Sequence, residues 1–173
     1  MGLSGAAGEA LGPPRPLAPE HDFSTFDCGE PALDDWLRRR AIPNQLSRVS
    51  RTYVLIAEGR VIGYYTLAAG AIAVTEAPGR VRRNMPDPIP MVVLGRLAID
   101  RGWQGRGLGQ LLLRDAVLRT LQAAETIGIR GLLVHALSPT AKRFYESRGF
   151  RESPANPMTL MVSLADAGVA IDP

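Results

Sequence analysis

Residues Leu94–Ile127 read LGRLAIDRGWQGRGLGQLLLRDAVLRTLQAAETI and predict a strand, a tight glycine-rich turn and a long helix. The strand is expected over Met91–Asp100, an apolar run that Gly95 and Arg96 interrupt. The turn is expected over Gln104–Gly109. Apolar residues that recur every three or four positions predict one buried face of the helix. They are Leu113, Val117, Leu121 and Ala124.

The glycines of this turn favour a phosphate-binding site. The first turn of a helix has backbone N–H groups without partners inside the helix, and these groups and the helix dipole attract anions. Side chains at Gly105, Gly107 and Gly109 would keep a phosphate away from those groups, and Arg106 can add positive charge from the flank. We therefore interpret the turn as a pyrophosphate cradle, with a glycine-rich connection that binds nothing as the alternative.

Two other phosphate-binding motifs fit the turn less well. A dinucleotide-binding fingerprint would need a glycine or another small residue at the position of Gln110. A P-loop would need a lysine followed by serine or threonine, and the only lysine of the chain is Lys142.

The chain resembles the GCN5-related N-acetyltransferase (GNAT) family from about Phe23 to Leu164. Gln104, Gly107 and Gly109 fill the Gln/Arg-x-x-Gly-x-Gly/Ala signature with which this family binds the pyrophosphate of acetyl-CoA. Further along, the sequence FYESRGF of residues 144–150 resembles the family motif FYE-x-x-GF. The resemblance implies an α/β (α+β) fold with a central mixed, mostly antiparallel sheet flanked by helices. It also implies splayed central strands that bind acetyl-CoA.

Within the family, the chain resembles the acetyltransferase toxins of bacterial toxin–antitoxin pairs. The stretches that carry this likeness are Phe26–Gly29 with Leu33–Leu37, Arg51–Val54 and Leu94–Asp100. The resemblance implies acetylation of the α-amino group of an aminoacyl-tRNA, which blocks translation, and neutralisation by a ribbon-helix-helix antitoxin. It also implies a homodimer.

Two other functions stay open at this point. The chain could acetylate a small amine or a protein N-terminus, in which case its arginines are only surface. It could also be a non-catalytic module that keeps acetyl-CoA as a structural ligand and acts through nucleic acid.

The resemblance assigns the coenzyme site to the central strand and the turn. Main-chain groups near Leu97 and Ile99 would bond the pantetheine arm, and an N–H near Leu97 or Ala98 would bind the oxyanion. The residues expected to contact acetyl-CoA are Leu97, Ala98, Ile99, Gln104, Gly105, Arg106, Gly107, Leu108 and Gly109.

Tyr145 matches the family tyrosine that lies near the coenzyme sulfur, so we expect it to be the general acid. A phenol has a pKa of about 10 and a thiol one of about 8.5, so proton donation is mildly uphill unless the site adjusts either value. A packing aromatic is the alternative interpretation.

The sequence contains no evident general base. His21, His135 and Cys28 are interpreted as structural residues. A base is unnecessary if the acceptor is an aminoacyl ester, because an α-amino group titrates near pH 8. Esterification removes the stabilising carboxylate and lowers that pKa further.

The net charge of +3 is unevenly distributed. Residues 17–35 contain six acidic residues and no Lys or Arg, whereas residues 36–151 contain 19 basic and 7 acidic residues. Arginine suits bidentate phosphate contacts, and a solvated charged surface is the alternative. The arginines expected to contact nucleic acid are Arg48 and Arg51, before a strand, and Arg80, Arg82 and Arg83, in an expected flexible loop at Glu76–Pro90.

A chain of 173 residues can bury one core. We expect a disordered leader over residues 1–19, a single N-acetyltransferase domain over residues 20–165 and a fraying tail over residues 166–173. No apolar run is long enough to span a membrane, and no secretory signal is evident. One cysteine and two histidines provide neither an internal disulfide nor a metal-ligand cluster, which favours a reducing cytoplasm and no metal.

Overall fold

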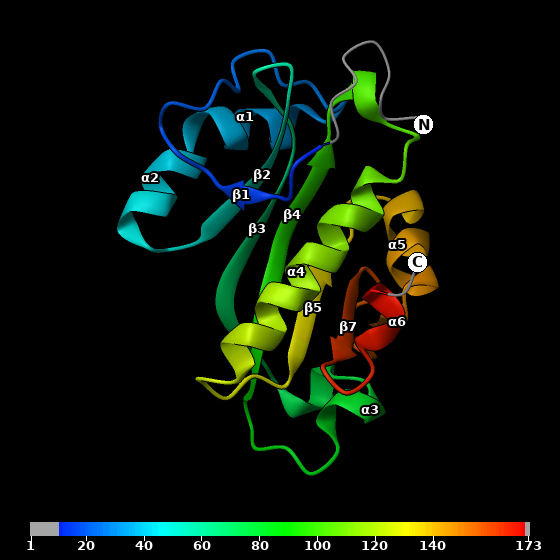
Figure 1. The fold of residues 1–173 in the computed structure, drawn as a ribbon. Coiled ribbons are helices and arrows are strands. Elements are labelled where there is room, and N and C mark those ends of the chain that lie inside the picture. The colour runs from blue at the N-terminus through cyan, green and yellow to red at the C-terminus, as the bar shows by residue number, and fades with distance from the viewer. Residues whose placement is uncertain (1–10, 172–173) are drawn as a thin grey trace. The chain divides into compact units, whose positions relative to one another are not determined.

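The computed structural model describes residues 11–171 and contains one mixed seven-stranded sheet (Figure 1). The strand order is β1-β2-β3-β4-β5-β7-β6. Strands β4 and β5 are parallel, and the β1–β2, β5–β7 and β6–β7 pairs are antiparallel. The strands are β1 (Arg15–Pro16), β2 (Arg51–Ala57), β3 (Arg60–Ile72), β4 (Ile89–Ile99), β5 (Gly131–His135), β6 (Arg151–Glu152) and β7 (Thr159–Ser163).

The helices lie between these strands in the chain, except that α6 follows the last strand. They are α1 (Pro31–Arg39), α2 (Ala41–Ser47), α3 (Gly79–Arg82), α4 (Leu108–Ala124), α5 (Pro139–Ser147) and α6 (Gly168–Ile171), with two short 3₁₀ turns at η2 (Val74–Glu76) and η3 (Arg101–Trp103). None of the helices within residues 11–171 combines the length and apolar character needed to cross a membrane.

The chain divides into two compact units. Of the described residues, the first unit contains 11–65 together with Leu97–Leu112, and the second contains Thr66–Arg96 and 113–171. Strands β3 and β4 and helix α4 contribute residues to both units.

The core of the first unit is built around Tyr64 of β3. Its ring packs edge-on against Phe26 at 5.5 Å between centroids and stacks on Trp36 at 6.0 Å. Its hydroxyl donates a 2.7 Å hydrogen bond to the carbonyl oxygen of Leu33, which fixes α1. The buried residues of this core are Leu17, Phe26, Leu33, Leu37, Ala41, Val54, Val61, Tyr64 and Ala98.

The chain before residue 20 contributes to this core, contrary to the expectation of a disordered leader over residues 1–19. Arg15 and Pro16 form β1 and pair with Tyr53 and Val54 of β2. Leu17 is buried, and its N–H donates to the carbonyl oxygen of Thr52. The expectation is therefore wrong for residues 15–17, because a buried leucine and two paired residues anchor them. Residues 1–10 lie outside the described part of the chain.

The second unit contains its own buried cluster, formed by Ala77, Val81, Ile89, Met91, Leu133 and Met161. Val81 belongs to α3, so the segment Glu76–Pro90 is not the flexible loop that its prolines predict. It includes a helical turn that one apolar side chain anchors to the core.

The C-terminal segment is also packed over the residues that the structure describes. Ala167 is buried, and Asp166 forms an ion pair with Arg80. The expected fraying after residue 165 is therefore wrong at these two positions, because Ala167 is buried and Asp166 pairs with an arginine that is distant in the sequence.

Candidate coenzyme and acceptor sites

The glycine-rich turn has the backbone that a phosphate cradle requires. Gly105 and Gly107 have positive φ angles of 80° and 79°, a region that glycine adopts without strain. A Cβ atom built on either residue would meet no atom within 4 Å, so this face of the turn is open. The first unit thus exposes backbone where a phosphate group can approach it closely.

Gly107 is the N-cap of α4, because its carbonyl oxygen accepts the N–H of Leu111 at 3.2 Å. Glycine has no side chain that can accept a hydrogen bond from the first turn of the helix. Helix α5 shows the usual alternative, since the hydroxyl of its N-cap Ser138 accepts from the N–H of Ala141 at 3.1 Å. A glycine N-cap leaves the anion-attracting end of α4 open to an external group.

Gln104 anchors the turn instead of extending its side chain from it. Its Nε2 donates to the carbonyl oxygen of Cys28 at 2.9 Å and to that of Ile99 at 2.8 Å. These two bonds use both hydrogens of the amide. Gln104 therefore ties the turn to the end of β4 and to the loop before α1.

Asp100, a buried residue, fixes the connection between β4 and the turn through hydrogen bonds. This buried carboxylate accepts from the N–H of Gly102 at 3.0 Å and from the N–H of Asp27 at 3.1 Å. The guanidinium of Arg60 lies 3.5 Å from it. The connection between β4 and the turn is thus fixed by side chains at both of its ends.

Arg106 folds back onto the turn. Its guanidinium carbon lies 4.5 Å from the ring centroid of Trp103, and Nη2 donates to the carbonyl oxygen of Gly102 at 3.2 Å. The positive charge is thereby held beside the turn, and contact between Arg106 and a phosphate stays a prediction.

The central strand continues past its paired segment. Strand β4 pairs with β5 from Met91 to Leu94 and then runs on to Ile99. Ala98 is buried, and Leu97 and Ile99 are partly buried. This extension is where the family resemblance expects the pantetheine arm.

Tyr145 lies on α5 in the second unit. It is 8% exposed, and its ring packs between Phe144 at 5.3 Å and Phe150 at 5.4 Å. Burial raises the pKa of the phenol well above its ordinary value. Among the described residues, its hydroxyl has no hydrogen-bond partner. The structure thus presents a protonated phenol with an uncommitted O–H group.

The other titratable candidates are engaged locally. Nδ1 of His21 accepts from the N–H of Ala18 at 3.0 Å, and Nδ1 of His135 lies 2.9 Å from Oγ1 of Thr159. Burial raises the pKa of the Cys28 thiol to about 11, so it is a poor nucleophile at neutral pH. Within residues 11–171, no group of three or more His, Cys, Asp or Glu residues could hold a metal ion.

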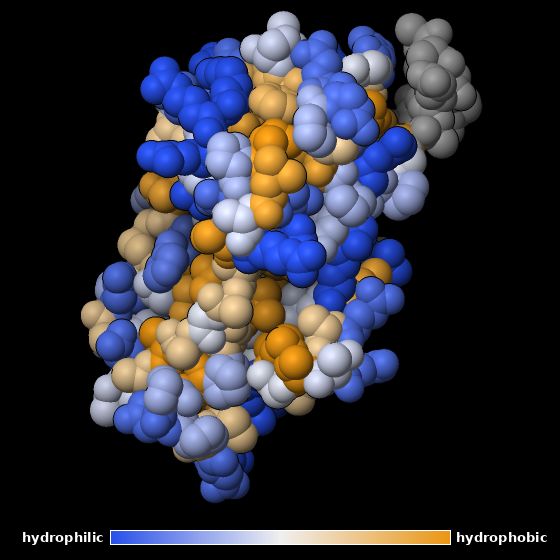
Figure 2. Space-filling view, turned by 90° about the vertical axis from the view of Figure 1, so that its left-hand side faces the viewer, coloured by the Kyte–Doolittle hydropathy of each residue, from blue (hydrophilic) through white to orange (hydrophobic). Residues whose placement is uncertain are grey.

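The arginines expected to contact nucleic acid occupy different settings. Arg48 ends α2 with a positive φ of 67° and is exposed between exposed Leu46 and Val49. Arg51 is exposed and donates to the carbonyl oxygen of Gln45. Figure 2 shows a surface on which apolar side chains gather between hydrophilic ones. In the first unit the predicted arginines thus lie beside exposed apolar residues.

The second group of arginines lies on and just after α3. Arg80 forms a bidentate pair with Asp166, whereas Arg82 and Arg83 are exposed and have no ion-pair partner among the described residues. Sequence reasoning missed two residues that share this region, Arg130 and Asp166. Both are distant from α3 in the sequence, and no local pattern identifies them.

The glycine N-cap turn, the extended central strand and the mixed sheet together define an acetyltransferase fold. A family model of the acetyltransferase (GNAT) domain matches residues 48–152, and the chain belongs to this family.

One similar protein and two solved structures match this chain over most of its length. A tRNA-acetylating toxin of Mycobacterium tuberculosis (strain ATCC 25618 / H37Rv) is 51% identical over 158 residues, covering 91% of this chain and 95% of that protein. The structure of AtaT complexed with acetyl-methionyl-tRNAfMet has a TM-score of 0.85 and 32% identity, covering 94% of this chain and all of that chain. A tyrosine-to-phenylalanine mutant of AtaT, bound to the C-terminus of the antitoxin AtaR and acetyl-CoA, has a TM-score of 0.78 and 32% identity. It covers 93% of this chain and 97% of that chain.

Proposed function

We propose that this protein is a toxin that transfers an acetyl group from acetyl-CoA to the α-amino group of an aminoacyl-tRNA and so blocks translation. The observation that carries the proposal is the open glycine turn at the N-terminus of α4, because it fits the pyrophosphate of the coenzyme. The likeness to a tRNA-acetylating toxin over most of both chains supports the choice of acceptor.

The residues that would hold acetyl-CoA lie in the glycine-rich turn, at the start of α4 and in strand β4. Backbone N–H groups at the start of α4 bind the pyrophosphate, and main-chain groups of β4 bind the pantetheine arm and the oxyanion. Gln104 is a positioning residue, because its amide is used to fix the turn. The contacting residues in this proposal are Leu97, Ala98, Ile99, Gly105, Arg106, Gly107, Leu108 and Gly109.

Tyr145 is the proposed proton donor. When bound, acetyl-CoA supplies an acetyl thioester, and the departing thiolate needs a proton. Burial keeps the Tyr145 phenol protonated, and its hydroxyl is not committed to another group among the described residues. The amine of an aminoacyl ester is largely neutral at cellular pH, so the chain needs no general base.

The proposed partners of this chain are an aminoacyl-tRNA, an antitoxin and a second copy of the toxin. The AtaT structures contain acetyl-methionyl-tRNA in one case and the C-terminus of the antitoxin AtaR in another, which supports an aminoacyl-tRNA acceptor and an antitoxin for this chain. We further propose that the antitoxin has a ribbon-helix-helix fold, that the toxin is a homodimer and that it acts in the cytoplasm. Sedimentation of the purified chain as a monomer would contradict the homodimer.

The proposed acceptor is tested by following labelled acetyl. Acetyl-CoA labelled in its acetyl group is offered with a charged total-tRNA pool, with deacylated tRNA and with free amino acids. We expect label on charged tRNA alone, and identification of the labelled species gives the preferred amino acid. Label on free amino acids or deacylated tRNA, with none on charged tRNA, would contradict the proposed acceptor.

We expect Gln104→Glu to raise the KM for acetyl-CoA roughly tenfold and to leave the KM for charged tRNA unchanged. The carboxylate cannot donate to the two carbonyl oxygens that the amide now binds, and each such bond contributes about 1 kcal/mol. Gln122→Glu makes the same chemical change on the exposed face of α4 and serves as the control. Equal KM values for acetyl-CoA in both variants would contradict a positioning role for Gln104.

We expect kcat/KM for charged tRNA to rise between about pH 6 and pH 8 and to stay level to about pH 9.5. The rise follows deprotonation of the acceptor amine. The plateau follows from Tyr145, because a phenol whose pKa is raised keeps its proton throughout this range and can donate it. Initial rates over this range test the profile, with the remaining charged tRNA measured at each pH. A falling limb below pH 9 on intact charged tRNA would contradict Tyr145 as the donor.

A further inference from the structure

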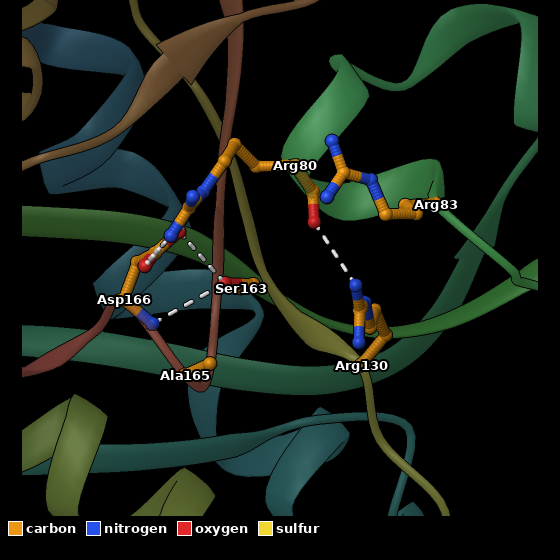
Figure 3. A pocket seen from close by; sticks show the side chains of 6 residues that line it. All are labelled: Arg80, Arg83, Arg130, Ser163, Ala165 and Asp166. Atoms are coloured by element: carbon orange, nitrogen blue, oxygen red, sulfur yellow. Dashed lines mark hydrogen bonds and ion pairs between the residues drawn. The ribbon is translucent and has the colours of Figure 1, made fainter.

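A basic cavity in the second unit is lined by residues that belong neither to the glycine-rich turn nor to α5. It has a volume of about 150 Å³, far above the roughly 10–15 Å³ that one water molecule needs, so a phosphate group fits inside. Figure 3 shows Arg80 and Asp166 paired on one side of the cavity, with Arg83 and Arg130 on the other. The lining residues are Arg80, Arg83, Arg130, Ser163, Ala165 and Asp166.

Arg130 is held in place before any ligand arrives. Its Nε donates to the carbonyl oxygen of Val81 at 2.9 Å, and its Nη2 donates to that of Arg80 at 3.0 Å. Guanidinium has five N–H donors, so three remain after these bonds. A guanidinium fixed on two backbone carbonyls presents its remaining donors with little further loss of conformational entropy.

Arg80 is largely neutralised, which leaves Arg83 as the adaptable cation. Nε and Nη2 of Arg80 both donate to Asp166, whose carboxylate also accepts from Ser163, and the Arg80 contact lowers the pKa of Asp166. Arg83 caps α3, is exposed and has no side-chain partner among the described residues. With three arginines and one aspartate, the lining favours an anion.

We propose that Arg83 and Arg130 form a pocket for a backbone phosphate of the RNA acceptor, an inference that rests on the proposed function. Arg130, which lines the pocket, directly precedes β5. Ser138 and α5, which carries Tyr145, follow the other end of that strand. The five residues of β5 span roughly 16 Å. The pocket therefore holds RNA away from the reacting amine and contributes to acceptor affinity, not to the chemical step.

The test measures binding of fluorescently labelled deacylated tRNA to the full chain at several salt concentrations. We expect Arg83→Glu to raise the Kd roughly tenfold and to reduce the slope of log K against log salt by about one, as loss of one phosphate contact does. Arg82→Glu makes the same charge change one residue away, outside the pocket, and should raise the Kd clearly less, by about threefold, because this exposed arginine can only add diffuse attraction to the RNA. The contrast separates a pocket from diffuse attraction.

A third variant is expected to bind tRNA more tightly, a gain that misfolding would not produce. Asp166→Asn removes the negative charge that neutralises Arg80, and we expect it to tighten tRNA binding several-fold. An equal change in Kd for Arg82→Glu and Arg83→Glu, or no tightening in Asp166→Asn, would overturn the proposal. Retained tRNA binding in Arg83→Glu would also overturn it and direct the search to an acidic segment of a protein partner.

Because this measurement uses uncharged tRNA, its result does not depend on acetyl transfer. Selective weakening by Arg83→Glu in a protein that labels no charged tRNA would support the pocket and remove the proposed acceptor reaction. Labelling of charged tRNA with equal binding by both arginine variants would support the reaction and remove the pocket.

Discussion

Tyr145→Phe is expected to reduce kcat for acetyl transfer to charged tRNA by about 10²- to 10⁴-fold, the usual contribution of a positioned general acid. Binding of acetyl-CoA should be unchanged, because the proposed contacts with the coenzyme are made by the turn and β4. Folding stability should be nearly unchanged, because the phenol hydroxyl makes no hydrogen bond among the described residues that phenylalanine would lose. Single-turnover kinetics, coenzyme titration and thermal unfolding measure the three quantities.

Tyr64→Phe supplies the matched control, since it removes a hydroxyl that is structural. Tyr64 is fully buried, and its hydroxyl donates to the carbonyl oxygen of Leu33 at 2.7 Å. We expect this variant to lose about 1 kcal/mol of stability, because a buried hydrogen bond to the carbonyl oxygen is lost, and to keep its kcat. A Tyr145→Phe enzyme that retains full kcat would remove Tyr145 from the chemistry.

The conformation of the glycine-rich turn was predictable from the sequence because it depends on neighbouring residues only. Positive φ angles at Gly105 and Gly107 and a glycine N-cap follow from residue types within one short stretch. The strand before it and the helix after it were likewise predicted, although β4 begins two residues earlier than its expected start at Met91. Local patterns identify elements well and their ends less well.

Side-chain roles were less predictable, because they depend on residues distant in the sequence. Gln104 is expected at the phosphate from the signature, yet its amide binds the carbonyl oxygen of Cys28, 76 residues away. Arg80 is expected to be available for RNA, yet Asp166, 86 residues away, neutralises it. No pattern around either residue contains its partner, and only the folded chain reveals it.

Proline-rich segments misled the prediction for a related reason. Prolines before Leu17 and around Val81 indicate irregular structure, and both segments nevertheless pack on a core. Buried apolar side chains contribute to holding each segment, Leu17 in the first and Ala77 and Val81 in the second, since burying a Leu or Val contributes roughly 1.5–3 kcal/mol. A single leucine or valine in a polar stretch carries too little periodicity to be recognised.

The second large effect is expected at the turn, where Gly107→Ala should raise the Kd for acetyl-CoA at least roughly 100-fold. The methyl group would occupy the open face over the first N–H groups of α4, which is the proposed pyrophosphate site. The substitution also places a non-glycine residue at a φ of 79°, which destabilises the fold by about 1–2 kcal/mol. Isothermal titration with acetyl-CoA and denaturant unfolding separate the two effects.

Gly59→Ala reproduces the backbone strain without the steric block. Gly59 lies in the turn between β2 and β3 of the same unit, has a φ of 75° and, like Gly107, has no atom within 4 Å of a built Cβ. Both variants should therefore lose the same stability, and only Gly107→Ala should lose coenzyme affinity. If the two bind acetyl-CoA equally well, the open face of the turn is not the pyrophosphate site. A loss confined to Gly107→Ala would mean that this face, and not merely an unstrained backbone, is what the coenzyme requires.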